Sequence, residues 1–155
     1  MSEGKYIKWG EGGFGAGDWK ILYDFIQTRE VKTVLEYGCG VTTELMMAVG
    51  LKVLSLETQQ KYADIPGANI LVFPYGEYPD GLGVYDLAFI DGPGAYEFES
   101  TGLKPERKLS AMHAKRHANA VYMHDAHLGQ NEVFDSDCRW KKVRDGDSNL
   151  IYEKI

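Results

Sequence analysis

Carboxylates stand at or just after several hydrophobic segments of the sequence. Glu36 precedes the glycine turn Gly38-Cys39-Gly40, and Glu57 follows twenty-one positions after Glu36. Carboxylates accept hydrogen bonds from hydroxyl and ammonium groups. Glycines let the backbone turn sharply and approach a ligand closely. The pattern therefore indicates a binding site for a small ligand that carries cationic or hydroxyl groups.

A second set of polar residues could act on a molecule that reacts with this ligand. Asp91 follows a strongly hydrophobic segment, and His124 and Asp125 follow the next one. Two alternatives are open. In the first, Asp91 and Asp125 bind Mg²⁺ or Mn²⁺, with His124 or His127 as a third ligand, and the ion orients and acidifies an acceptor. In the second, the site is metal-free and His124 or Asp91 is the general base.

These residues need elements that bring them together. Short hydrophobic runs bounded by glycine are typical of inner parallel strands. Strands are predicted over residues 32–37, 51–56, 69–73, 85–93 and 118–123, and helices over 18–28, 43–49, 59–63 and 105–117. A closing hairpin is predicted from 140–144 and 149–153 around Gly146. Because parallel strands deliver their carboxyl ends to one edge of a sheet, we expect the candidate residues to meet there.

Composition limits the classes of protein. A chain of 155 residues fits one domain, which we place at 18–155 after a glycine-rich arm or lid at 1–17. A net charge of −6 argues against general nucleic-acid binding. No apolar run is long enough to cross a bilayer, and the first residues lack the apolar core of a signal peptide. We therefore expect a cytoplasmic protein with neither a nucleic-acid nor a membrane partner.

The motifs VLEYGCG, VLSLET, YDLAFIDGPGAY and VYMHDAH, in this order, resemble the class I S-adenosylmethionine-dependent methyltransferases over nearly all of residues 18–155. The resemblance implies a three-layer, Rossmann-like α/β fold with a mostly parallel seven-stranded sheet and an antiparallel C-terminal hairpin. It also implies S-adenosylmethionine as cofactor. Glu36, Gly38 and Gly40 would lie along its methionine portion, Glu57 would bind the ribose hydroxyls, Tyr75 would border the adenine, and Asp91 would lie between cofactor and acceptor.

Within this superfamily, Asp91-Gly92-Pro93 and the His124-Asp125 pair are similar to O-methyltransferases that act on sugars or small molecules, in particular the glucuronoxylan 4-O-methyltransferase group. The chain is shorter than those enzymes and lacks an obvious acceptor-binding insertion. The expected acceptor is a small-molecule or carbohydrate hydroxyl. Three alternatives are open: a catalytically silent S-adenosylmethionine-binding module, a nucleotide-binding oxidoreductase, and a homo-oligomer in which a second chain completes the acceptor pocket. Thr43 argues against the oxidoreductase alternative, because a dinucleotide fingerprint has its third glycine at this position.

Two segments allow more than one interpretation. The basic residues of 104–116 could attract an anionic acceptor or form a solvated helix face, with Leu109 and Met112 inward and His113 and His117 at the surface. Trp9, Phe14 and Trp19 could close over the acceptor or pack against the sheet edge. Cys39 is a nucleophile in principle, but its small side chain also suits the turn.

Overall fold

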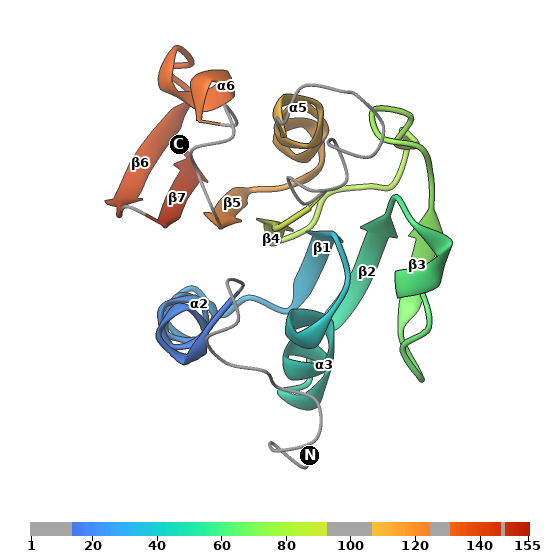
Figure 1. The fold of residues 1–155 in the computed structure, drawn as a ribbon. Coiled ribbons are helices and arrows are strands. Elements are labelled where there is room, and N and C mark those ends of the chain that lie inside the picture. The colour runs from blue at the N-terminus through green and yellow to red at the C-terminus, as the bar shows by residue number, and fades with distance from the viewer. Residues whose placement is uncertain (1–13, 93–106, 125–130, 147) are drawn as a thin grey trace.

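A seven-stranded sheet forms the centre of the protein (Figure 1). The computed structural model describes residues 14–92, 107–124, 131–146 and 148–155. The strand order is β3-β2-β1-β4-β5-β7-β6. The bounds are Thr33–Tyr37 for β1, Lys52–Glu57 for β2, Asn69–Val72 for β3, Leu87–Ile90 for β4, Ala120–His124 for β5, Trp140–Asp145 for β6 and Asn149–Lys154 for β7. The first five strands are parallel, whereas β7 is antiparallel to both β5 and β6. The predicted Rossmann-like fold is confirmed.

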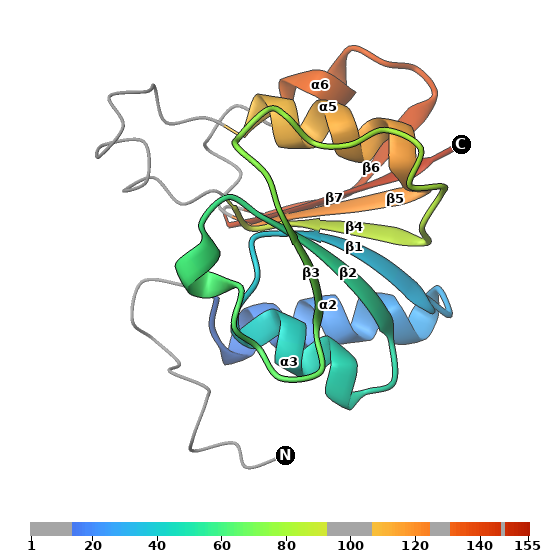
Figure 2. The ribbon, with the colours of Figure 1, turned by 90° about the vertical axis from the view of Figure 1, so that its right-hand side faces the viewer.

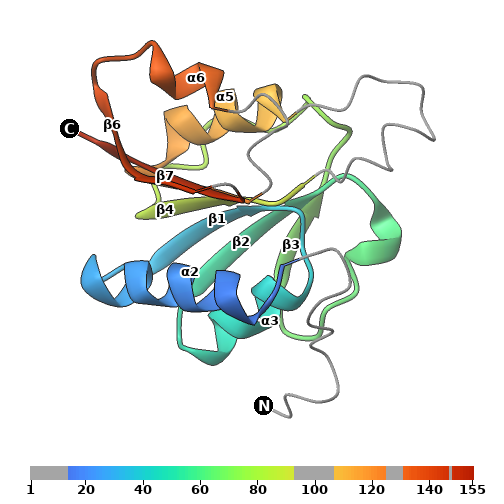
Figure 3. The ribbon, with the colours of Figure 1, turned by 60° about the vertical axis from the view of Figure 1, so that its left-hand side comes forward.

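Helices cover both faces of the sheet and make three layers (Figures 2 and 3). One face carries α2 (Ala16–Thr28) and α3 (Val41–Ala48), and the other carries α5 (Lys108–His117) and the short α6 (Glu132–Asp135). Alternate residues of each inner strand point to opposite faces. In β1, for example, Val34 packs in the core with α2 and α3, and Leu35 packs in the core with α5. Burial on both faces explains why β4 is a continuous hydrophobic run and why β1 and β5 are mostly hydrophobic.

Between β3 and β4 the chain crosses the α5 face without forming a helix, as the green segment of Figure 2 shows. Residues 73–86 contain two prolines and three glycines, which oppose a helix. The segment is held by side chains instead: the Tyr78 ring packs edge-on against Tyr37 at 5.4 Å between centroids, and its hydroxyl lies 3.0 Å from Ser110 Oγ. Residues 60–62 form a single 3₁₀ turn, η1 (Gln60–Tyr62), after β2.

The buried face of α5 differs from the predicted one. Leu109 and Met112 are 40% and 42% exposed, whereas His113 and His117 are buried. The predictions that the leucine and methionine face inward and that the histidines lie at the surface were therefore wrong. The physical reason is the segment 73–86, which supplies polar partners to the inward face of α5. Helix α6 lies in a segment for which no element was predicted, and no helix in the described ranges has the length and apolar character needed to span a membrane.

Candidate functional site

The turns after β1 and β4 lie in direct contact at the carboxyl edge of the sheet. Gly38 has a φ of +89°, and its N–H donates to Leu56 O at 2.9 Å. A Cβ atom on Gly92 would lie 2.8 Å from Gly38 Cα, which is closer than packed atoms approach. Both glycines are therefore required: Gly38 for its left-handed backbone and Gly92 for the close approach.

Glu36 lies inside this turn rather than at its surface. Its side chain is fully buried and accepts hydrogen bonds from Ser55 Oγ at 2.6 Å, from Thr42 Oγ1 at 2.7 Å and from the Thr43 hydroxyl. Burial raises the pKa of Glu36 to about 7, although the three hydroxyls oppose the shift. The Glu36 carboxylate therefore joins α3 to β1 and β2.

Glu57, at the tip of β2, reaches the glycine turn after β1. One carboxylate oxygen accepts from Cys39 N at 3.2 Å, and the other accepts from Thr58 N at 2.8 Å and Gln59 N at 2.9 Å. Cys39 Sγ lies 3.4 Å from the first of these oxygens. Burial and the Glu57 charge raise the pKa of the Cys39 thiol, so this cysteine is not an activated nucleophile.

Asp91 and His124 form a hydrogen-bonded pair at the tips of β4 and β5. His124 Nδ1 lies 2.9 Å from Asp91 Oδ1, and the guanidinium of Arg107 lies 3.7 Å from the same oxygen. Arg107 also donates to His124 O at 2.8 Å. The histidine and arginine side chains are buried, whereas Asp91 is 24% exposed. The buried side chains of His124 and Arg107 therefore orient one partly exposed carboxylate.

The other nitrogen of His124 faces a second carboxylate, that of Asp18, which stands in none of the motifs of the sequence. His124 Nε2 lies 3.4 Å from Asp18 Oδ2, on the first turn of α2. Since both ring nitrogens face carboxylate oxygens, the imidazole satisfies both contacts only as a double donor. This geometry favours Asp91 over His124 as a general base.

Asp18 is held by one neighbouring backbone group and by residues far away in the sequence. It accepts from Gly15 N at 2.8 Å and from Asn149 Nδ2, on β7, at 2.8 Å. Burial raises the pKa of Asp18, but the bonds from Asn149, Gly15 N–H and His124 outweigh it and hold the pKa below its ordinary value. Asp18 by itself could be recognised only as a helix-start residue, because two of its partners, Asn149 and His124, come from distant parts of the chain.

Phe14 completes this side of the site. Its ring lies 5.3 Å from the His124 ring and 5.5 Å from the Phe89 ring, and it is buried. Phe14 therefore packs against the sheet, as one of the two interpretations of the aromatic residues expected. Trp9 lies outside the described residues, as do Asp125, His127 and most of the predicted arm at 1–17.

Tyr75, the predicted adenine neighbour, lies against the start of α5. Its hydroxyl accepts from Leu109 N at 3.2 Å. A separate cavity of about 550 Å³ lies between α5, α6 and β6, with Lys115, Arg116, Arg139 and Lys154 in its lining. Lys154 N bonds Asn119 O just before β5 begins, so this cavity is at the opposite edge of the sheet from Asp91.

Known structures share this architecture. A candidate RNA methyltransferase from Pyrococcus horikoshii superposes with a TM-score of 0.67 at 14% identity, over 97% of this chain and 91% of that one. An O-methyltransferase from Bacillus cereus in complex with SAH superposes with a TM-score of 0.64 at 14% identity, over 91% and 81%. A candidate O-methyltransferase from Klebsiella pneumoniae superposes with a TM-score of 0.64 at 14% identity, over 95% of this chain and 83% of that one. The chain has the class I methyltransferase fold.

The similarity between this chain and these proteins is structural. The sequence matches no protein-family model, and no curated protein matches it.

Proposed function

We propose that the protein is an S-adenosylmethionine-dependent methyltransferase that transfers the methyl group to a hydroxyl of a small molecule or carbohydrate. One arrangement supports this above all: Glu57, the glycine turn at Gly38 and the Asp91–His124 pair meet at one edge of a sheet of the methyltransferase fold. Ligands of open α/β sheets bind at this edge.

The residues present fit the proposed cofactor. A Cβ on Gly40 would meet none of the described atoms within 4 Å, so no side chain in the described ranges packs against the turn at this point. The carboxylate of Glu57 already accepts from Cys39 N, Thr58 N and Gln59 N, so a ribose hydroxyl would share or take over part of this bonding. The cofactor would supply an electrophilic methyl group on a sulfonium.

Asp91 is the residue that we assign to the acceptor. Methyl transfer needs an acceptor oxygen held in line and partly deprotonated, and positioning supplies much of the rate. His124 and Arg107 both hold Oδ1 of Asp91, so the carboxylate has a fixed orientation from which it could accept a hydroxyl proton.

We favour the metal-free alternative at this edge. Within the described residues, Arg107 lies 3.7 Å and His124 Nδ1 lies 2.9 Å from Oδ1 of Asp91, so this oxygen already has two partners. His124 could join Asp91 on an ion only by giving up its bond to that carboxylate. Full methyl transfer in EDTA supports this choice, and activity that requires added Mg²⁺ or Mn²⁺ contradicts it.

The acceptor class is the finer part of the proposal. Structural neighbours include both O-methyltransferases and a candidate RNA methyltransferase. The net charge of −6 disfavours a polyanionic acceptor. Parallel assays with hydroxylated small molecules, sugars and RNA separate the two classes.

The first test of the proposal is calorimetric titration of S-adenosylmethionine and of its demethylated product into the wild type, E57A and E57Q. We expect micromolar affinity for the wild type and a loss of roughly tenfold or more in both variants, because a ribose hydroxyl loses its charged acceptor. D24N, on an exposed carboxylate of α2, is the matched control and retains affinity.

Thermal unfolding checks that the Glu57 variants fold, since this carboxylate also accepts three backbone N–H groups. Absence of binding in the folded wild type overturns the proposal. Binding without methyl transfer to any acceptor, unchanged in D91N, favours the silent binding module instead.

A further inference from the structure

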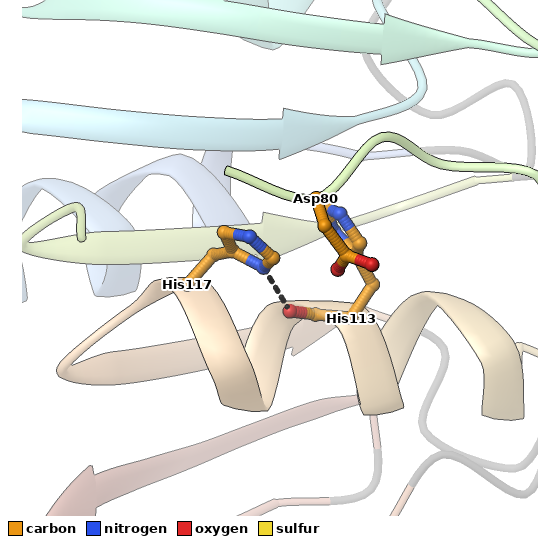
Figure 4. A group of neighbouring side chains, drawn as sticks. All are labelled: Asp80, His113 and His117. Carbon is orange, nitrogen blue, oxygen red and sulfur yellow. Dashed lines mark hydrogen bonds between the residues drawn. The ribbon is translucent and has the colours of Figure 1, made fainter. Parts of the chain in front are cut away.

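The buried histidines of α5 form a cluster that the proposed reaction does not use. Asp80, His113 and His117 each place one ligand atom within 4.8 Å of the others (Figure 4). The histidines stand one turn apart on α5, and the aspartate comes from the segment 73–86 that crosses above the helix. Two imidazoles and a carboxylate are ligands that zinc prefers.

His117 is oriented as a metal ligand. Its Nδ1 lies 2.9 Å from His113 O, and because a carbonyl only accepts, this nitrogen carries the proton. The lone pair is then on Nε2. Zinc-bound histidines commonly donate their second nitrogen to a carbonyl in this way, which fixes the tautomer and the direction of the ring.

His113 can supply the second nitrogen after a change of tautomer. Its Nε2 lies 2.6 Å from Pro79 O, and its Nδ1 lies 2.6 Å from the Tyr37 hydroxyl. An ion on Nε2 takes the place of the proton with which this nitrogen faces the Pro79 carbonyl. The hydrogen bond between Nδ1 and the Tyr37 hydroxyl is then kept with Nδ1 as the donor, since a phenol hydroxyl both donates and accepts.

Asp80 is the movable ligand. Its side chain is 80% exposed and pairs with Arg116 at 3.3 Å, an exposed contact that contributes little stability. Ligand atoms around a tetrahedral zinc ion lie about 3.4 Å apart. The ligand atoms now lie within 4.8 Å of one another and the two imidazole rings are stacked at 4.2 Å between centroids, so binding requires a shift of the Asp80 side chain and a rotation of the rings.

We propose that Asp80, His113 and His117 form a zinc-binding site that fastens the segment 73–86 to α5, with water in the fourth position. The segment contains no helix or strand, so an ion that joins it to α5 stabilises the folded state by mass action. The site is separate from Asp91 and does not depend on the proposed function.

Calorimetric titration of Zn²⁺ into the tag-free, full-length protein tests the site. We expect one ion per chain, a higher melting temperature with zinc, and affinity at least tenfold weaker in D80N and H117Q, because each loses a ligand. R116Q removes a competing cation and is expected to tighten binding by up to about fivefold. D24N is the matched exposed carboxylate and leaves the affinity unchanged.

Two outcomes overturn the proposal. One is the absence of zinc binding in the folded wild type. The other is zinc binding that D80N leaves unchanged, which would place the ion elsewhere in the chain. D80N keeps the test decisive if H117Q fails to fold, because the aspartate is exposed and its removal leaves the core intact.

Discussion

At the scale of single residues, Glu36 shows how a carboxylate can serve as a structural centre. Three hydroxyls from α3 and β2 donate to it inside the protein. A buried carboxylate with hydroxyl partners can exist protonated, because a hydroxyl also accepts a hydrogen bond. Its titration is therefore linked to the stability of the fold.

Glu36 is expected to make stability fall as the pH rises from about 4.5 to about 7. Its pKa is raised from 4.5 to about 7 in the folded protein, so the folded state holds the proton more tightly than the unfolded chain. The stabilisation is complete below pH 4.5 and is lost as the pH rises through 7. The shift corresponds to about 3 kcal/mol.

Urea unfolding of the wild type and E36Q across this range measures the effect. Glutamine keeps an acceptor and a donor without the charge, so the difference in unfolding free energy between the two proteins isolates Glu36. His113 titrates in part of the same window with the opposite sign, since its pKa is lowered, but it contributes equally to both proteins. A difference that stays constant with pH would contradict the prediction.

At the scale of elements, the contact between the turns after β1 and β4 fixes the geometry of the site. G92A places a methyl group 2.8 Å from Gly38 Cα, and neither backbone can move aside without breaking strand pairs. We expect a loss of roughly 1–3 kcal/mol in the free energy of unfolding, typical of overpacking, together with weaker cofactor binding.

G17A is the matched control, because a Cβ there meets nothing within 4 Å and Gly17 lies in α2. Alanine is the better helix former, so this variant is expected to be equally or slightly more stable. Denaturant unfolding of both variants, followed by the titration of S-adenosylmethionine, measures the two effects. A G92A protein as stable as the wild type would show that the two turns are not rigidly held.

The elements themselves could be predicted because their signals are local. The predicted strand at 51–56 and hairpin strand at 149–153 lie within one residue of β2 and β7. The buried side of α5 could not be predicted, because the partners of His113 are Tyr37 and Pro79, distant in sequence. Asp91 and His124 were expected to meet from their strand positions, whereas Asp18 and Arg107 gave no local sign of their roles.

At the scale of the whole molecule, the interior and the margins of the sheet differ in burial. All residues of β4 and β5 are buried, whereas β6 is exposed after its first residue and β3 is half-buried or exposed. Amides of β1, β4 and β5 should therefore exchange with solvent only through global unfolding, and those of β3 and β6 through smaller openings.

Native-state hydrogen exchange at several urea concentrations measures this difference. We expect β4 and β5 amides to report the global free energy, of about 5–15 kcal/mol for a domain of this kind, and β3 and β6 amides to exchange at lower free energy with weak urea dependence. Equal protection in all seven strands would mean that the sheet opens only as one unit.

The outer strand β6 also has a consequence for the colloidal behaviour of the protein. Lys141, Lys142 and Arg144 are exposed along it, and the pairing register shifts between Lys142 and Arg144. Positive charge and a local irregularity both prevent a foreign strand from adding to a sheet. The opposite margin, β3, has the sequence Asn-Ile-Leu-Val and carries no charge. Concentrated solutions should therefore associate through β3, and a charged residue at Val72, which is 36% exposed, is the change that would raise solubility.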